Sequence, residues 1–417
     1  DAKAKKSGHT DLSEYKKIAD KSGATSFIGY SDLKSESKIN GILVDGISVS
    51  AAHAGDEVEI VLDRTPFYAE GGGQLADGGK ISLSSGAVIE IDDVQTPVNG
   101  LSVHRGRVIS GEVSIGIDAL AEIDIERRHA ISRAHTATHM VHKAFREILG
   151  ETATQAGSEN SPGRFRFDFP ATGAVSASVL NDVESRVNTL LLDNLEVTAE
   201  SMSQAKAKEL GAMALFGEKY GDVVRVVSVG DWARELCGGT HVSRSGQLGV
   251  VKLLGESSIG AGVRRVEALV GVDAYKFLAR EHILLNSLTD LIKGARTEEL
   301  PERISDMLNK MKEIEKELAS VRSAQALSQA GDLSKSAKDV NGYTFISSVM
   351  SDGVSGDDLR KIAIDLRAQH NNSVVALLSN NDGKPVLVVA VSEEARAKGI
   401  KAGALVKLGS TVLGGGG

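Results

Sequence analysis

The spacing of the apolar residues changes near residue 125, and this change constrains the fold more than any other feature of the sequence. From about residue 25 to 125 the apolar residues form short runs, such as KINGILVDG and AVIEIDDVQ, separated by turns that contain Gly and Asp. Such runs are typical of antiparallel strands. After residue 125, RRHAISRAHTATHMVHKAFREILG has apolar residues at helical spacing and a glycine at its end. The pattern predicts a small β-barrel followed by a domain that begins with a long helix.

The remaining segments favour an α+β multidomain chain with four parts. We expect an N-terminal helix and β-barrel over 1–125, an α+β domain over 126–271, a helical linker over 272–332 and a C-terminal α/β domain over 333–417. In the linker, Pro301 is expected to divide two helices. The second helix has apolar residues spaced alternately four and three apart, at Met307, Met311, Ile314, Leu318 and Val321. This seam covers about two heptads, which favours an intramolecular helical hairpin over a long coiled coil.

Composition limits where this chain works and what it binds. The 417 residues include one cysteine, Cys237, which excludes an intrachain disulfide and favours a reducing compartment such as the cytoplasm. No apolar run approaches the roughly 20 residues that cross a bilayer, so no membrane partner is expected. The net charge is −8, and residues 41–125, with 14 acidic and 4 basic residues, account for −10 of it. The rest sums to +2 (−8 minus −10), so a phosphate-binding face would be a local patch outside the acidic segment.

Two pairs of metal-ligand residues share the same spacing. His135 and His139 lie four residues apart and would occupy one face of a helix, which is a common first half of a zinc site. Cys237 and His241 repeat the spacing, with Gly238 and Gly239 between them to allow a tight bend. A His-x-x-x-His pair alone is more often a packed pair, and a single cysteine is more often a small apolar residue. Two such pairs in one predicted domain favour a metal site. Since His129 and His142 have no second partner, we expect them at the surface or behind the ligands.

Further polar and glycine-rich motifs lie near these pairs. The segment FYAEGGGQ places three glycines, Gly71, Gly72 and Gly73, before Gln74, and such a triplet marks either a barrel corner or a backbone that approaches a substrate. Gln155 and Asp168 follow the histidine helix and could face the metal as catalytic groups, although each taken alone is more often structural or exposed.

Several motifs, in their order along the chain, resemble the editing domain of alanyl-tRNA synthetases. They are AHTATHMVHKAFREILG, TQAGS, RFRFDF, MALFGEKYGD and ELCGGTHVSRSGQLG with GVRRVEALVG. FYAEGGGQLADGG resembles the glycine motif of the preceding barrel, and the last segment with GGGG resembles the family's C-terminal domain. No class II aminoacylation core is recognisable; in this family it would precede residue 1. We therefore expect a piece of a longer synthetase that does not itself charge tRNA.

The resemblance implies a function and roles for residues. It implies hydrolysis of the ester that joins serine or glycine to the 3′ adenosine of tRNA(Ala), with Zn²⁺ held by His135, His139, Cys237 and His241. Gln155 would help to place the substrate or water, and Thr138 would hydrogen-bond the seryl hydroxyl. Four protein ligands close a tetrahedral site, so a zinc ion that positions the substrate is favoured over one that activates water.

The C-terminal region is expected to bind tRNA and to support a homodimer. Two alternatives stay open at this point. The chain could be a free-standing deacylase that edits in trans, although such relatives usually lack the long C-terminal part. It could also be a non-catalytic piece that binds tRNA, dimerises and carries a structural zinc.

Overall fold

The chain divides into two compact units, Asp1–Ile283 and Leu284–Gly417. The computed structural model describes residues 12–213, 221–292, 294–381 and 383–414. Most of the motif MALFGEKYGD and the last three glycines lie outside the described residues. The barrel and the α+β segment that follows it both lie in the first unit and share buried contacts, such as that of Asp77 with Arg128.

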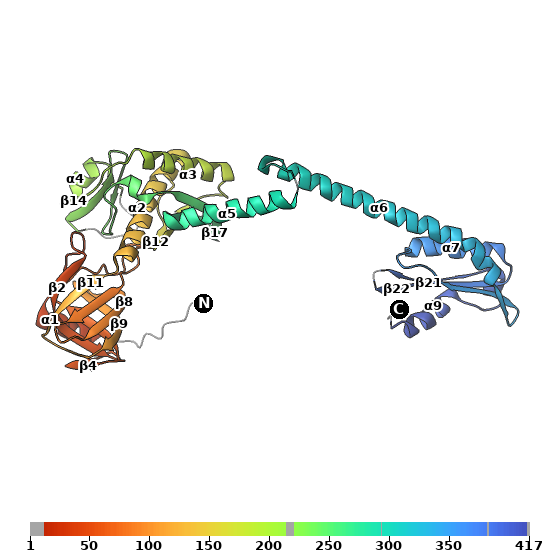
Figure 1. Cartoon of the computed structure of the whole chain (residues 1–417), viewed down its shortest axis with the longest axis horizontal. Coiled ribbons are helices and arrows are strands. Elements are labelled where there is room, and N and C mark those ends of the chain that lie inside the picture. The colour runs from red at the N-terminus through yellow and green to blue at the C-terminus, as the bar shows by residue number, and fades with distance from the viewer. Residues whose placement is uncertain (1–11, 214–220, 293, 382, 415–417) are drawn as a thin grey trace. The chain divides into compact units, whose positions relative to one another are not determined.

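The first unit begins with a closed β-barrel, as the short apolar runs predicted (Figure 1). Six strands form the ring in the order β11, β7, β8, β9, β5 and β2; β11 pairs again with β2 to close it, and β3 extends the sheet beyond β2. The strands are β2 (Lys34–Val44), β3 (Ile47–Val49), β5 (Glu57–Leu62), β7 (Gly79–Leu83), β8 (Val88–Val98), β9 (Leu101–Ser110) and β11 (Asp118–Ile123). Two short pairs accompany them: β1 (Ser26–Phe27) with β6 (Arg64–Thr65), and β4 (Ala51–His53) with β10 (Glu112–Ser114).

Alternation along the strands fills the interior of the barrel. In β2, buried and exposed positions alternate over its first half, because successive side chains of a strand point to opposite faces. The core is mainly aliphatic and includes Ile39, Ile42, Ile60, Leu62, Phe67, Ile81 and Ile89. Helix α1 (Leu12–Ser22) covers one side of the barrel and buries Tyr15 and Ile18 there.

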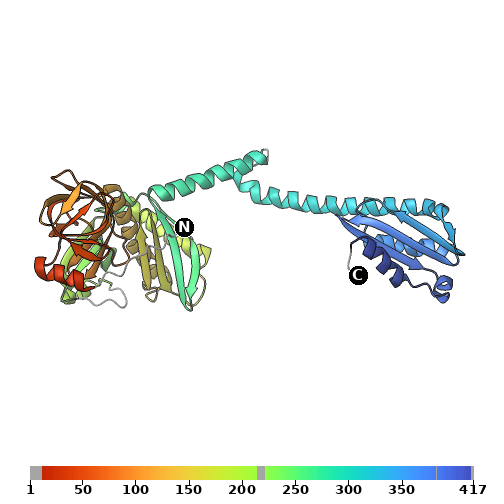
Figure 2. The same ribbon diagram turned by 90° about the horizontal axis from the view of Figure 1, so that it is seen from below.

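Helix α2 (Ile125–Leu149) follows the barrel directly. The Asp124 carboxylate caps its first turn by accepting the Arg127 backbone N–H, and Gly150 ends it with a φ of 98°. Both α2 and α3 (Ala177–Leu192) pack on a four-stranded sheet of order β12, β13, β18, β17 (Figures 1 and 2). These strands are β12 (Gly157–Ser161), β13 (Arg164–Pro170), β18 (Val263–Val270) and β17 (Val251–Gly260).

A second, three-stranded sheet lies beside α2 in the same unit. It consists of the antiparallel strands β14 (Val197–Ser203), β15 (Val223–Val229) and β16 (Ala233–Leu236). Helix α4 (Gln204–Glu209) packs against β14 and β15, and the short helix η1 (Ser245–Leu248) follows β16 in the chain. Cys237 follows β16 at once, so the end of this strand sets the place where the CGGTH segment starts.

A buried ion pair joins α2 to the barrel. Arg128 on α2 is 3% exposed and donates from Nε to both carboxylate oxygens of Asp77 at 3.0 Å. The guanidinium also donates to the backbone carbonyls of Gly29 at 2.6 Å and Pro66 at 2.7 Å. Charge-assisted hydrogen bonds of this kind are among the strongest in proteins, and here they hold the start of α2 in one place on the barrel.

Two helices follow the first unit's last strand. They are α5 (Val272–Leu291) and α6 (Leu300–Leu333), with the short turn η2 (Thr297–Glu299) before α6. Pro301 lies in the first turn of α6, where a missing N–H breaks no helical bond, so the predicted division falls before it.

The apolar seam of α6 is exposed in the described part of the chain. The five seam side chains named above are between 47% and 61% exposed, so no partner helix in the described part of the chain covers them. A seam of about two heptads buries too few side chains to hold two helices together unaided. Instead α6 packs through its C-terminal end, where Ala326 joins the core of the last domain.

The second unit ends in a small α/β domain. Its sheet has the order β19 (Lys338–Val340), β20 (Tyr343–Val349), β21 (Ser373–Asn381), β22 (Lys384–Val391). Helix α7 (Gly356–Gln369) connects β20 to the parallel strand β21, and the Ser355 hydroxyl caps it by accepting the Asp358 backbone N–H. The short helix η3 (Ser334–Ser336) precedes β19, and helices α8 (Glu393–Ala397) and α9 (Ala402–Val412) follow β22. None of the helices in the described part of the chain combines the length and apolarity that a membrane crossing requires.

Candidate metal centre

The two histidines of α2 share one face of the helix, as their spacing predicted. The rings of His135 and His139 stack with centroids 5.0 Å apart, and both side chains are 3% exposed. One helical turn separates them, so both rings point to the same place beside the helix.

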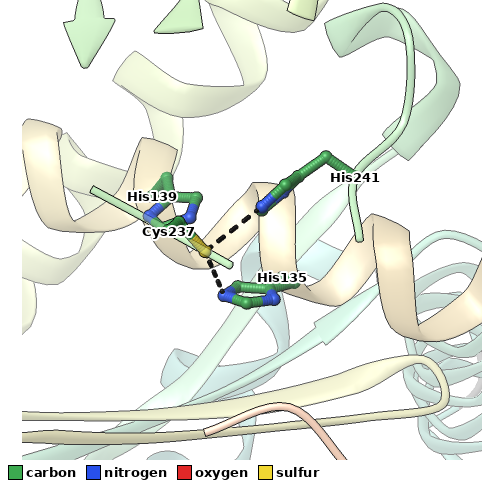
Figure 3. Close-up of side chains that lie close together, drawn as sticks. All are labelled: His135, His139, Cys237 and His241. Atoms are coloured by element: carbon green, nitrogen blue, oxygen red, sulfur yellow. Dashed lines mark hydrogen bonds between the residues drawn. The ribbon is translucent and has the colours of Figure 1, made fainter. Parts of the chain in front are cut away.

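Cys237 and His241 come to the same place from the segment after β16 (Figure 3). The Cys237 sulfur lies 3.3 Å from His135 Nε2 and 3.4 Å from His241 Nε2. The His241 ring centroid is 4.6 Å from that of His135 and 5.0 Å from that of His139. One ligand atom from each of the four residues lies within 4.8 Å of all the others. The fold therefore brings together two pairs that are about a hundred residues apart in sequence.

The bend between Cys237 and His241 needs a glycine and an arginine. A Cβ on Gly239 would lie 2.2 Å from His135 Cε1, so no other residue fits there without displacing the ring. Arg225 Nη1 donates to the carbonyls of Cys237 and Gly239, both at 2.9 Å, and its guanidinium stacks 4.0 Å from the centroid of the Tyr30 ring. These contacts satisfy backbone groups that an irregular loop would otherwise leave unpaired.

Each candidate histidine ligand has a partner at its second ring nitrogen. His135 Nδ1 lies 2.8 Å from Gln74 Oε1, His139 Nδ1 is hydrogen-bonded to Glu235, and His241 Nδ1 lies 3.1 Å from Thr136 Oγ1. Glu235 also accepts from His142 Nδ1 at 2.8 Å. Metal-bound histidines usually carry such a partner, which orients the ring and sets its tautomer.

The electrostatics of the site favour a cation. Burial alone would raise the pKa of the Cys237 thiol, but the three neighbouring histidines lower this pKa well below its usual range. Burial would likewise lower the pKa of His139, whereas Glu235 and Cys237 raise it to about 10. The pKa of His241 falls to about 3, chiefly through burial. A metal cation would take the place of the proton on His139, because metal ligands bind deprotonated.

The residues fit zinc. Three imidazole nitrogens and a thiolate are ligands that zinc prefers, and a tetrahedral zinc separates its ligand atoms by roughly 3.3–3.6 Å, close to the sulfur–nitrogen distances observed. His139 Nε2 is buried and lacks a hydrogen-bond partner in the described part of the chain. An ion among the four ligands would give this atom a partner.

The other predicted catalytic residues have defined partners. Thr138 is buried, and its hydroxyl lies 2.6 Å from Asn160 Oδ1 and 3.0 Å from the Ala134 carbonyl oxygen. Gln155 is half-buried and donates to Ser158 Oγ at 3.1 Å. Both carboxylate oxygens of Asp168 accept from Arg265, at 2.7 and 2.8 Å, so this carboxylate joins β13 to β18.

The glycine triplet and Gln74 have different surroundings. Gly71 and Gly73 border a cavity of about 310 Å³ that Glu70, Leu75, Gln95, Ser158, Glu159 and Arg166 also line. Gln74, expected to face an approaching substrate, is instead fully buried against His135 and Thr240. The difference arises because Gly73, with a φ of 77°, turns the chain inward against Ser158.

Sequence reasoning missed Glu235, Arg225 and the role of Gln74. Glu235 is 1% exposed between two histidines, although its neighbours in ARELCGG gave no indication of this. His142 proves to be a buried partner of Glu235, whereas His129 is exposed. A basic residue inside the otherwise apolar strand VVRVVSV is the pattern that could have drawn attention to Arg225.

Models of known families match three parts of the chain. Residues 1–127 match tRNA synthetases class II (A), and residues 224–267, which include Cys237 and His241, match the threonyl and alanyl tRNA synthetase second additional domain. Residues 342–417 match the DHHA1 domain.

Curated relatives match the chain from end to end. The alanine–tRNA ligase of a Nocardioides species is 59% identical over the whole chain and 46% of its own length. Those of Streptomyces avermitilis and Acidothermus cellulolyticus are 56% and 55% identical, again over the whole chain and 47% of their own length. The chain spans about half the length of the curated relatives it matches. By this similarity along its entire length, the chain belongs to the alanine–tRNA ligase family.

Proposed function

We propose that this chain removes wrongly attached amino acids from tRNA(Ala), hydrolysing the ester of seryl-tRNA and glycyl-tRNA. The observation that carries the proposal is the convergence of His135, His139, Cys237 and His241, in a family member, within 4.8 Å of one another. In the reaction, water adds to the ester carbonyl carbon and the bond from this carbon to the ribose oxygen breaks.

The need for such a reaction follows from the limits of molecular recognition. A charging pocket that fits alanine cannot strongly exclude the smaller glycine, nor can it reject serine through one added hydroxyl. One methylene is worth only about 1–3 kcal/mol in a pocket, so a second, hydrolytic site is required for higher fidelity.

The four ligands would hold Zn²⁺, which when bound supplies a Lewis-acidic centre that can polarise a substrate oxygen. Because four protein ligands close a tetrahedral site, we assign the ion to positioning rather than to water activation. The chain's own residues then bind and orient the substrate around it.

Thr138 is proposed to recognise the seryl hydroxyl. Thr138 lies between the two ligand histidines in the sequence, and its hydroxyl oxygen, after donating to Asn160, keeps a lone pair that can accept a hydrogen bond. Alanine gains nothing at such a polar position, and glycine needs another explanation. Thr138→Val should therefore slow hydrolysis of seryl-tRNA and spare glycyl-tRNA; a wild-type rate with seryl-tRNA would remove this role.

Gln155 and the glycine triplet are proposed to border the substrate. Gln155 precedes β12, against which Gly73 packs, so its amide can help to place substrate or water. Gly71 and Gly73 border the cavity, and a Cβ on Gly72 would meet nothing within 4 Å, so we propose that the substrate approaches the backbone of the triplet here. Asp168 is proposed as a third catalytic group, whose carboxylate is held in place by Arg265.

The C-terminal domain is proposed to bind the tRNA body and to support a homodimer, and the expected setting is the cytoplasm. A second function is favoured by the closed ligand set: the zinc could be purely structural, in a chain that binds tRNA without hydrolysing it. The two functions differ in one measurable property, the release of amino acid.

The test is deacylation by the 417-residue chain. We expect free serine to be released from seryl-tRNA faster than alanine from alanyl-tRNA, a chelator to abolish the release, and added Zn²⁺ to restore it. Cys237→Ala should lose the activity, while His129→Ala, an exposed histidine on the same helix, should keep it. Metal binding without deacylation under any condition would favour the structural role and overturn the proposed reaction.

A further inference from the structure

We infer that Gln74, a residue of the barrel segment, is a positioning residue of the metal centre: its side-chain oxygen holds the His135 proton on Nδ1 and leaves Nε2 free to bind the metal. The inference rests on the proposed metal site and deepens it. It makes the barrel part of the metal centre, although all four ligands belong to the segment after it.

The hydrogen bonds around Gln74 identify its oxygen without ambiguity. The Thr240 backbone N–H, which can only donate, points to Gln74 Oε1 at 2.8 Å, and Gln74 Nε2 lies 2.9 Å from Thr240 Oγ1. The reverse orientation of the amide would bring two donors together at Thr240. The atom that faces Thr240 N is therefore the acceptor oxygen.

The same oxygen determines the tautomer of His135. Oε1 lies 2.8 Å from His135 Nδ1, and since a carboxamide oxygen accepts only, Nδ1 must carry the hydrogen. In the neutral ring Nε2 then has a lone pair, and this atom lies 3.3 Å from the Cys237 sulfur, on the side of the other ligands. The opposite tautomer would present an N–H to the metal position and could not coordinate.

Gln74 itself is held rigidly from several sides. Its backbone N–H donates to the Gly71 carbonyl at 2.9 Å, and Leu75 N–H donates to the Asn160 carbonyl at 3.1 Å. Gln74 is 0% exposed, and a Cβ on Gly239 would lie 2.7 Å from its oxygen. A buried amide whose oxygen and nitrogen are both hydrogen-bonded keeps one orientation. This fixed orientation allows the Gln74 oxygen to set the tautomer of His135.

The three histidine ligands differ in where their partners come from. Glu235 precedes the cysteine loop by two residues, and Thr136 lies on α2 beside the histidines, so both belong to the segment that carries the ligands. Gln74 comes from the turn before β7, 61 residues before His135. His135 is thus the ligand whose tautomer depends on how the barrel is docked.

The test compares three variants of the 417-residue chain. Gln74→Met keeps the volume and removes the strong acceptor, Gln74→Glu keeps an acceptor for both His135 and Thr240, and Gln95→Leu is a control. Gln95 lies on β8 of the same barrel and bonds Glu70 and Asp93. Zn²⁺ affinity is measured by competition with a chromophoric chelator, and the His135 tautomer by long-range ¹H–¹⁵N spectra of the metal-free, histidine-labelled chain.

We expect Gln74→Met to lose about 10- to 100-fold in Zn²⁺ affinity, the usual effect of removing such a partner, and Gln74→Glu to recover most of it. Gln95→Leu should match the wild type. In the metal-free wild type His135 should be protonated on Nδ1. An Nε2-protonated His135 in the wild type, or equal affinity of Gln74→Met and Gln95→Leu, would overturn the inference.

The spectra answer the question even if Gln74→Met does not fold. If the wild type bound no Zn²⁺ at all, the proposed metal centre would fail, while the tautomer of His135 would still decide the role of Gln74. Deacylation is not among these readouts, so a chain without activity leaves the test intact.

Discussion

Replacing Gly239 by alanine tests the geometry of the metal centre with a single methyl group. The added Cβ would lie 2.2 Å from His135 Cε1 and 2.3 Å from His135 Nδ1. Nonbonded carbon atoms pack at about 3.5–4.0 Å, so the ring would have to move by more than about 1 Å. Functional constellations tolerate only about 0.5 Å. His135 would therefore leave the position in which it faces the other ligands.

The size of the effect follows from where the strain is relieved. Forcing an extra methyl group into a packed site costs about 1–3 kcal/mol. Without metal, His135 can turn away and avoid most of this cost, whereas the metal-bound ring must stay in place. The strain therefore appears mainly as lost affinity. Since about 1.4 kcal/mol corresponds to a factor of ten, Zn²⁺ should bind about 5- to 150-fold more weakly.

The neighbouring glycine supplies a matched control. A Cβ on Gly238 would meet only Tyr30 Oη, at 4.0 Å, which is an ordinary contact. Both variants are compared with the wild type by chelator competition for Zn²⁺, with circular dichroism to verify the fold. We expect Gly238→Ala to bind like the wild type. Equal affinities of the two alanine variants would refute the reasoning that His135 is a ligand pressed against the Gly239 backbone.

Three further predictions concern stability. Burial lowers the pKa of His104 to about 4, below its ordinary value of about 6.5. The unfolded chain therefore binds this proton more readily, and the free energy of unfolding should fall by about 2 kcal/mol from pH 7 to pH 5. Urea unfolding of His104→Asn should show a smaller pH dependence. Arg128→Met leaves a buried carboxylate unpaired and should cost about 3–5 kcal/mol in urea unfolding, a result that an unchanged midpoint would contradict. On α6, Met307→Ser and Leu318→Ser should each change the free energy of thermal unfolding by less than about 0.5 kcal/mol, because both side chains are exposed. Ala326→Leu overfills a core and should cost about 1–3 kcal/mol. A large loss in either serine variant would indicate that the seam is covered.

Local signals predicted elements well where they act over a few residues. The N-terminal helix expected before the barrel forms α1, and the helix expected after residue 125 forms α2. Short apolar runs in 25–125 predicted strands, and Pro301 marked the division between two helices. These features depend on side-chain periodicity and on backbone constraints that neighbouring residues set among themselves.

Features that depend on a partner far away in sequence could not be predicted in detail. The seam of α6 has the spacing of a coiled coil, but spacing does not show which helix would cover it. The salt bridge of Asp168 with Arg265 of β18 could likewise not be predicted from the sequence. Gln74 followed three glycines and suggested a substrate approach, yet the turn directs it inward to His135.

The metal centre depends both on local sequence and on contacts between residues far apart in the chain. By itself, the sequence determined the ligand types, the shared spacing of four and the glycines that permit a bend, because these are properties of a helical turn and of single residues. Only the tertiary structure decided that the two pairs meet, and that Gln74, Glu235 and Thr136 stand behind the histidines. The physical reason is that a histidine tautomer is set by the atom facing its second nitrogen, and packing of the barrel, α2 and β16 supplies that atom.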